Sequence, residues 1–364
     1  MKRDHMKRIA ILEYIGCQEY PELHDYPKQS SGAIDDLSKE VAKSDLLNEG
    51  DSMLRAVVHD LNCEGISKIH CCRHVSNGPI VSDLDVTENL SSDSNVSWHW
   101  IQSGERFLEA WLRVAQVCDE AMVIAPEIDH ELLLATRFLR SHGIRLRNAD
   151  DRFIATASDK ALTARHWRKS SVSQPWTVLL RNHWFVSSRR QQLLDFSSQA
   201  WVLKPRDGAG GVGIRRFECI DHLQLWNEHR ITSPNEMLVQ PWLEGVAASI
   251  AIVFHDDQTA TEMPARNQVL TATVIDSTVG GKDVQFHQIA YGGSGPPWPP
   301  GAQRVAATFA RKAIAAIPGV PLGWIGLDFL CEGSPLEIES YVAIEINPRL
   351  TSSYCERIEI SLPH

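Results

Sequence analysis

The 364-residue chain lacks an excess of positive charge, a CxxC cysteine pair and any apolar run of 18 residues. Acidic residues outnumber basic ones by 46 to 36, and the net charge of −10 disfavours a broad nucleic-acid-binding surface. Without a long apolar run we expect no membrane span. Eight cysteines without CxxC spacing favour reduced thiols, so we expect a cytoplasmic protein rather than a disulfide framework.

Two common nucleotide-binding motifs are also missing. No GxGxxG follows the first predicted strand, which argues against a dinucleotide-binding fold of that type. The chain has no GxxxxGK[ST] phosphate loop either, because Lys204 precedes the nearby glycines instead of following them. Any nucleotide site must therefore be built differently.

The first 150 residues alternate between strand and helix patterns. Strands are predicted at 8–14 and 121–125, and helices at 48–60, at 107–115 and from an N-cap at Asp129 to Leu139. Residues 27–40 and 75–97 carry no clear period and are predicted as loops. This order favours a parallel α/β domain, which we place at residues 1–155.

Beyond residue 200 the pattern changes to an α+β arrangement with antiparallel character. Strands are predicted at 201–204, 237–240, 248–254, 268–275, 285–290, 324–330 and 341–346, and one helix at 305–317. The Gly/Pro-rich residues 291–301 are expected to be a spacer or a pocket-lining loop. We divide this part into a smaller lobe at 156–242 and a larger lobe at 243–364.

Oxygen-bearing side chains stand in two apolar strands near the C-terminus. Residues i and i+2 of a strand share a face, so Glu345 and Asn347 project together while Ile344 and Ile346 face the other way. If the strand of Asp328 lies alongside, three oxygen ligands converge. Carboxylate and amide oxygens suit Mg²⁺, and Arg349 beside them would bind phosphate. Solvated strand ends are the competing interpretation for Asp328.

A predicted strand ending at Lys204 runs into a glycine-rich turn. Glycine allows the backbone to approach an anion and turn its N–H groups inward, which applies to Gly208, Gly210, Gly211 and Gly213. Upstream, Asp159 favours the start of a helix at 161–169, which would bring the charge of Lys160 near a phosphate.

A further segment breaks at Pro241, which leaves backbone groups free to bind an adenine edge. We assign the nucleotide contacts of this segment to Gln240, Trp242, Leu243 and Glu244, with Glu244 as acceptor for ribose hydroxyls. A solvated turn is an equally good interpretation of Glu244.

Together these segments resemble the ATP-grasp ligases over about residues 150–355. The resemblance implies an α+β fold of two lobes that clamp ATP under a glycine-rich loop. It also implies Mg²⁺, replaceable by Mn²⁺, on Asp328, Glu345 and Asn347, with phosphate bound by Lys160 and Lys204. One departure is Ala247, where many members of the family carry an acidic residue for the ribose.

A narrower resemblance is to the tyramine–glutamate ligase group of methanofuran biosynthesis. Its motifs are residues 125–127, 266–268, 291–293 and 347–354. It implies that the chain joins an acid, glutamate, to an amine such as tyramine through an acyl phosphate. Lys204 and Arg349 would be catalytic, Arg266 would clamp the acid, and Thr351, Ser352 and Ser353 would position substrate. A surface salt bridge is the alternative for Arg266, and a cap of the final turn is the alternative for the other three residues.

Other functions remain compatible with the sequence. They are an ATP-grasp reaction on a different acid and amine, a carboxylase, and a non-catalytic ATP-binding regulatory protein. We expect small-molecule substrates, no nucleic-acid or membrane partner and, from the family resemblance, a homodimer.

Overall fold

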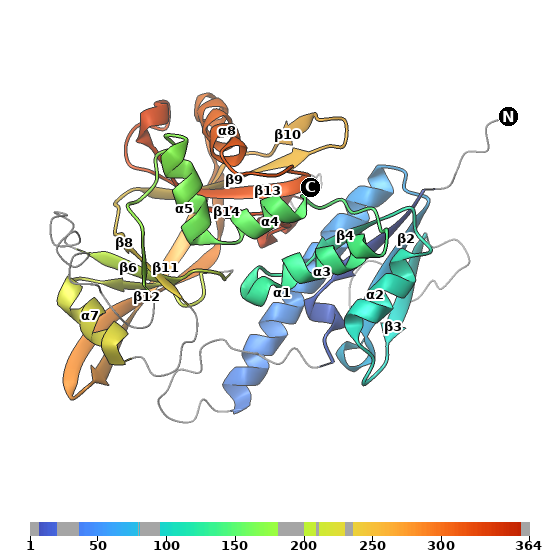
Figure 1. Cartoon of the computed structure of the whole chain (residues 1–364), viewed down its shortest axis with the longest axis horizontal. Helices are drawn as coiled ribbons and strands as arrows, with labels where there is room; N and C mark the ends of the chain where they lie inside the picture. The colour runs from blue at the N-terminus through green and yellow to red at the C-terminus, as the bar shows by residue number, and fades with distance from the viewer. Residues whose placement is uncertain are drawn as a thin grey trace.

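The computed structural model describes residues 7–19, 36–78, 80, 95–180, 200–208, 211–229 and 236–357. Its elements form two sheets with helices packed on them, as the sequence predicts, a parallel one built from the N-terminal part and a larger, antiparallel one beyond it (Figure 1). No helix in the described part of the chain is long and apolar enough to cross a membrane. The domain boundaries, the cytoplasmic location and the homodimer stay predictions.

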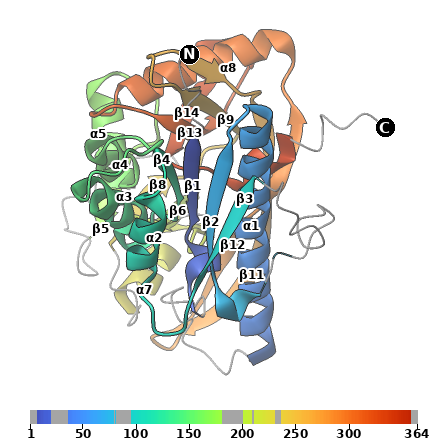
Figure 2. The same cartoon turned by 90° about the vertical axis from the view of Figure 1, so that its right-hand side faces the viewer.

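The N-terminal sheet has four parallel strands in the order β3-β2-β1-β4. Its strands and helices are β1 (Arg8–Glu13), α1 (Asp36–Cys63), β2 (Lys68–His74), β3 (Val96–Ile101), α2 (Phe107–Ala115), β4 (Glu120–Ile124) and α3 (Glu131–Ser141). Side chains alternate along β1, so Ile9 and Ile11 pack with α1, whereas Ala10 and Leu12 belong to the cluster that contains Trp111. Helices therefore cover both faces of this sheet (Figure 2).

The larger sheet runs β14-β13-β9-β11-β12-β7-β6-β8-β5, with β10 paired to β9. Its strands are β5 (Val178–Leu180), β6 (Trp201–Pro205), β7 (Arg215–Phe217), β8 (Met237–Pro241), β9 (Val246–Phe254), β10 (Ala260–Glu262), β11 (Arg266–Val279), β12 (Lys282–Pro297), β13 (Gly323–Cys331) and β14 (Tyr341–Asn347). The helices of this half are α4 (Asp151–Ala157), α5 (Lys160–Lys169), α7 (Ile220–His229) and α8 (Pro300–Ala315). The strands predicted beyond residue 200 are thus confirmed.

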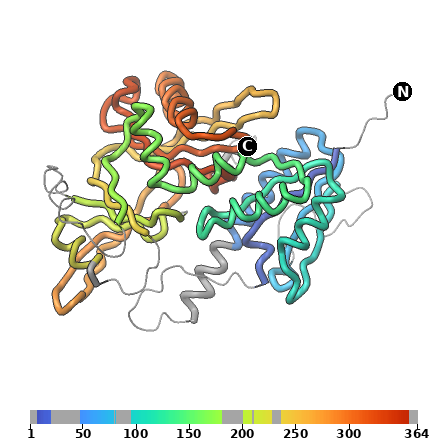
Figure 3. Tube along the Cα trace, in the orientation of Figure 1, coloured from blue at the N-terminus to red at the C-terminus, as the bar shows by residue number. Residues whose placement is uncertain are grey.

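Three hydrophobic clusters hold these elements together. One joins α2 and α3 to α8 and to the strands β9, β13 and β14, so the two sheets share a continuous core. A second places Leu350 and Tyr354 against α1. The third contains side chains of α7 and of the strands β6, β8 and β12. The backbone of α7, β6 and β8 lies on the left in Figure 3, away from the blue N-terminal strands. The second cluster therefore fixes the segment after β14 beside the N-terminal part of the chain.

Three local predictions are wrong. Residues 36–40 belong to α1, because residues 36–47 contain no proline or glycine and many helix formers, although they lack an apolar stripe; residues 27–35 of that predicted loop lie outside the described residues. Asp129 does not cap α3: its φ is 51°, it lies in a 3-10 turn, and α3 begins only at Glu131. The predicted loop at 75–97 holds a 3-10 turn at Val75–Asn77 and the start of β3, with most of the rest outside the described residues.

The Gly/Pro-rich residues 291–301 are also not a separate loop, because β12 continues to Pro297 and α8 begins at Pro300. A Cβ on Gly295 would lie 3.1 Å from the Cβ of Asn267, so a small residue lets β11 and β12 approach closely. The expectation of a pocket lining holds for Tyr291, which borders the cavity described next.

Candidate functional site

The predicted oxygen ligands lie on adjacent antiparallel strands. Asp328 on β13 is the register partner of Glu345 on β14, and its partner on the other side is Ser249 on β9. Ser249 in turn pairs with Arg266 on β11. Cross-strand partners project from the same face of a sheet, so these four side chains form one row across four strands. The convergence of Asp328 and Glu345 follows directly from strand register.

Hydrogen bonds fix the orientation of Asp328. Asn347 donates from Nδ2 to Asp328 Oδ2 over 3.1 Å, and Gln268 donates from Nε2 to Oδ1 over 2.8 Å. A β-bulge beside this pair breaks the expected alternation, because the register passes from Glu345 to Ala343 and skips Ile344. Ile344 therefore lines the cavity instead of facing away from it, which corrects the sequence prediction, whereas Ile346 is buried in the core as expected.

Two lysines approach the row of acids from other elements. Lys160 is the first residue of α5, whose N-cap Asp159 accepts from the backbone N–H groups of Ala161 and Leu162, as predicted. Its Nζ lies 3.0 Å from Glu345 Oε1 and donates to the carbonyl of Gly208 over 2.8 Å. Lys204, buried in β6, donates to the carbonyl of Ile344 over 3.5 Å. Both ammonium groups thus reach β14.

The glycine-rich turn connects β6 to β7, which pair as an antiparallel hairpin. Gly208, Gly211 and Gly213 have positive φ values of 129°, 75° and 77°. A Cβ on Gly213 would lie 2.9 Å from Pro205 Cγ, so both the backbone angle and the space require glycine there. Gly210 lies outside the described residues. The Gly208 carbonyl is held by Lys160, which joins the turn to α5.

The segment predicted to contact the base begins at the end of β8. Gln240 is buried there and donates to Thr177 Oγ1 over 2.8 Å, and the backbone N–H of Trp242 bonds to the Ala200 carbonyl over 2.9 Å. The indole N–H of Trp242 donates to Glu244 Oε1 over 2.8 Å. The Glu244 side chain is exposed and therefore accessible to a ligand.

One cavity of about 280 Å³ joins these groups. Its lining contains the predicted residues Lys204, Gly211, Gln240, Trp242, Leu243, Glu244, Asp328, Glu345, Asn347 and Arg349, together with Thr351, Ser352 and Ser353. Lys160, Gly208, Gly213 and Arg266 are not among the lining residues. Arg266 stands in the same row as Asp328 but donates to the Gly295 carbonyl over 3.4 Å, so its role as an acid clamp stays a prediction.

Arg349 links the cavity to the N-terminal sheet. Its Nε donates to Glu127 Oε2 over 2.7 Å, and the Glu127 side chain, just beyond β4, is buried. Burial lowers the pKa of the Arg349 guanidinium, but the carboxylates of Glu127 and, to a smaller extent, Glu49 raise it overall. The positive charge that lines the cavity is therefore held from the other half of the molecule.

Burial and like charge act on Asp328 in the same direction. Burial and the neighbouring Glu345 carboxylate raise the pKa of Asp328 to about 7, against the lowering effect of its hydrogen bonds with Asn347 and Gln268. Burial lowers the pKa of Lys204 to about 8, although Glu345 acts to raise it. A bound cation would neutralise the repulsion between the two carboxylates.

The donor chemistry of this cluster suits a hard cation. Two carboxylates and one amide supply oxygen ligands, which Mg²⁺ prefers. In the part of the chain that the structure describes, no three or more His, Cys, Asp and Glu side chains group in a way that could hold a metal. Oxygens from Asn347 and from substrate or water would therefore complete such a site.

Several residues of the site escape sequence reasoning because their roles depend on tertiary contacts. Gln268 on β11 orients Asp328, and Thr177, the residue before the edge strand β5, orients Gln240. Glu127 belongs to one of the quoted motifs, but nothing in its sequence context indicates an ion pair with Arg349, 222 residues away. Ser249 could have been found only through strand register.

A family model described as an ATP-grasp domain matches residues 157–353, more than half of the chain. The chain belongs to the ATP-grasp family. The match spans Lys160 and Lys204, the glycine turn, and Asp328 and Glu345. A search of curated proteins finds no match to the chain.

Solved ATP-grasp structures share the fold at low sequence identity. An ATP-grasp superfamily protein from Archaeoglobus fulgidus is 16% identical, with a TM-score of 0.58, 95% of this chain covered and 82% of that one. The D-alanine–D-alanine ligase of Bacillus anthracis is 12% identical, with a TM-score of 0.53 and coverage of 95% and 88%. Carboxyaminoimidazole ribonucleotide synthase from Aspergillus clavatus, complexed with ATP, is 15% identical, with a TM-score of 0.54 and coverage of 95% and 71%. At these identities the comparison establishes the fold.

Proposed function

We propose that the chain is an ATP-dependent carboxylate–amine ligase that forms an amide and releases ADP and phosphate. The observation that carries the proposal is that one cavity is bordered by the carboxylates Asp328 and Glu345, by Lys204, and by the Gln240–Gly245 segment. Family membership adds weight, because the matched region spans all of these residues.

In this proposal the nucleotide lies between the glycine turn and the end of β8. Backbone groups of residues 240–244 other than the Trp242 N–H contact the adenine. The exposed Glu244 accepts from the ribose, because position 247 is alanine and not an acidic residue. Lys160, Lys204 and the N–H groups of the turn bind the phosphates. Preorganised cations of this kind stabilise phosphoryl transfer by neutralising the charge on the phosphates.

Asp328, Glu345 and Asn347 would hold Mg²⁺, with Mn²⁺ as a substitute. The ion, when bound, would supply neutralising charge for the phosphates. Arg349 adds a guanidinium at the same end of the cavity, with Glu127 holding its Nε. Lys160 is already paired with Glu345, so it would move from the carboxylate to phosphate when both ion and nucleotide bind.

The reaction follows from this arrangement. A carboxylate oxygen of the acid attacks the γ-phosphorus of ATP, which breaks the bond to ADP and leaves an acyl phosphate. The neutral amine then attacks the acyl carbon and the amide C–N bond forms. Phosphate leaves with the electrons of the C–O bond and takes up the proton that the nitrogen loses. The narrower motifs support glutamate as the acid, activated at its γ-carboxylate, and tyramine or a tyrosine-like amine as the nucleophile, in the synthesis of a methanofuran-type cofactor.

Release of ADP with Mg²⁺–ATP across a panel of acids and amines, with mass spectrometry of the products, tests this function. We expect ADP and a γ-glutamyl amide from glutamate and tyramine. If only another pair gives an amide, the narrow assignment is wrong and the ligase stands. If no pair gives ADP, the ligase proposal fails. Asn347→Ala should reduce turnover at least 100-fold with the fold intact, whereas Asn95→Ala, at a residue that does not line the cavity, should not.

A further inference from the structure

A carboxylate from the N-terminal part of the chain borders the same cavity. Glu49 lies on α1, is exposed, and is among the lining residues together with Arg349 and the hydroxyl-bearing Thr351 and Ser353. Its charge helps to raise the pKa of Arg349, but the described residues form no hydrogen bond or close ion pair with its carboxylate. None of the nucleotide or cation roles proposed above uses it, so its presence in a cavity that must accept phosphates and an acid requires another explanation.

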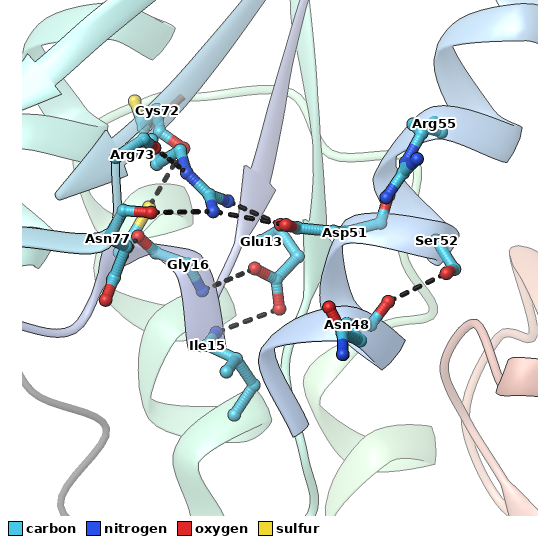
Figure 4. Close-up of polar contacts among 12 residues, drawn as sticks. Glu13, Ile15, Gly16, Asn48, Asp51, Ser52, Arg55, Cys72, Arg73 and Asn77 are labelled. Atoms are coloured by element: carbon cyan, nitrogen blue, oxygen red, sulfur yellow. Dashed lines mark hydrogen bonds and ion pairs between the residues drawn. The ribbon is translucent and has the colours of Figure 1, made fainter. Parts of the chain in front are cut away.

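Buried contacts fix the backbone immediately after Glu49. Asp51 forms a buried ion pair with Arg73 on β2, in which Arg73 Nη2 donates to Oδ2 over 3.1 Å (Figure 4). Gly50 lies so close to Glu13 that a Cβ there would be 2.8 Å from Glu13 Oε1. The Gly50 backbone and the Asp51 side chain thus lie against the parallel sheet, and Glu49 is held on the cavity side.

The Glu13 carboxylate is itself immobilised. Its oxygens accept from the backbone N–H groups of Ile15, over 2.8 Å, and Gly16, over 2.6 Å (Figure 4). On the other flank, Tyr354 donates to Asp60 and packs in the same cluster as Met53 and Leu54 of α1. Helix α1 is therefore fixed both to the carboxyl end of β1 and to the segment after Arg349, which is the kind of support that a binding residue needs.

A fixed anion next to an acid substrate repels it unless that substrate also carries a cation. The amine nucleophile cannot be that cation, because a neighbouring carboxylate would keep it protonated and unreactive. An α-amino acid, however, carries a separate ammonium group that takes no part in the reaction. We infer that Glu49 binds the ammonium group of the acid substrate, which is therefore a zwitterionic amino acid. This inference rests on the proposed ligase function and names its substrate class.

Calorimetric binding of matched acids to the full chain, with Mg²⁺–ADP present, tests the inference without turnover. Glutamate and glutarate differ only by the ammonium group, as do aspartate and succinate. We expect wild-type protein to bind one amino acid about 10- to 100-fold more tightly than its amino-free analogue, as for a charge-assisted hydrogen bond. Glu49→Gln should reduce that ratio to about twofold or less and leave ADP affinity unchanged, since it retains shape and removes charge.

Glu109→Gln is the matched control, because Glu109 is an exposed acid on α2 whose partner, Arg106, lies on the same surface. It should keep the wild-type ratio. The inference is overturned if the wild-type protein binds neither amino acid more tightly than its analogue. It is also overturned if Glu49→Gln keeps the wild-type preference for the amino acid. If the Glu49-dependent preference is found but no acid and amine give ADP, the inference holds for binding and the ligase proposal is the part that fails.

Discussion

At the scale of single residues, the site concentrates charges that the fold alone does not need. Asp328 and Glu345 face each other with Lys160 and Lys204 close by, and the pKa values of Asp328 and Lys204 shift toward neutrality. Clustered groups with shifted pKa values are typical of functional sites, which give up stability for binding. Both shifts lead to pH-dependent predictions.

Asp328→Asn should stabilise the unliganded protein at pH 8 by about 1–3 kcal/mol. A raised carboxyl pKa costs stability above the unfolded value near 4, and the full cost is reached above the folded value of about 7. The advantage of the variant should therefore shrink as pH falls from 7 and vanish near pH 4. Urea unfolding at pH 8 and pH 4.5 measures it; an equal difference at both pH values would show that charge is not the cause.

The kcat/KM for ATP should fall about tenfold per pH unit above pH 8 in the wild-type protein. Lys204 is charged below its pKa of about 8 and becomes neutral above it, so its attraction for phosphate is lost as pH rises. Lys204→Met should have a low kcat/KM throughout and lack this fall. Lys312→Met, at an exposed lysine that donates to Ser171, should keep the wild-type profile. A fall of equal size in Lys204→Met would assign the titration to another group.

At the scale of elements, the positions of the strands along the chain were predictable, whereas the contacts between the strands were not. Period-2 apolar patterns located β9, β13 and β14 because each is buried on at least one face. The β-bulge at Ile344 left no signal, since it arises from the pairing with β13. The same holds for Gln268 and Glu49, which line the cavity, and for Glu127, which binds the cavity residue Arg349. These residues come from elements far apart in the sequence.

The glycine turn between β6 and β7 gives a prediction at this scale. Gly213→Ala should destabilise the turn by about 1–3 kcal/mol and raise the KM for ATP, because φ is 77° and the new Cβ would meet Pro205. Gly65→Ala is the control: its φ is 75°, but a Cβ there has no atom within 4 Å. Thermal unfolding and ATP kinetics of both variants measure it. An equal KM change in the two would remove the turn from nucleotide binding.

At the scale of the whole molecule, two sheets share one core and meet at the cavity. The Glu127–Arg349 pair, the Glu49 side chain and the packing of Tyr354 on α1 all connect the parallel sheet to the segment after β14. The fold was predictable at this level because its motifs resemble a known family. The relation between the sheets was not, since it depends on contacts between residues up to 294 positions apart.

Glu127→Gln tests this connection. Removing one partner of a buried ion pair leaves the Arg349 charge uncompensated, so we expect a loss of about 3 kcal/mol of stability and a lower kcat. Asp256→Asn is the matched control, because the Arg145–Asp256 pair also joins the two halves but is exposed, and we expect less than about 1 kcal/mol. Urea unfolding and ADP release measure both. A similar small effect in both variants would show that Glu127 does not hold Arg349.

Transfer of oxygen isotope from acid to phosphate tests the central claim most directly. The acid that supports ADP release is labelled with ¹⁸O in its reacting carboxylate and incubated with Mg²⁺–ATP and the amine, and the phosphate is examined by mass spectrometry. Because an acyl phosphate passes one carboxylate oxygen to phosphorus, we predict one ¹⁸O in each phosphate released. Amide formation with unlabelled phosphate would contradict the account.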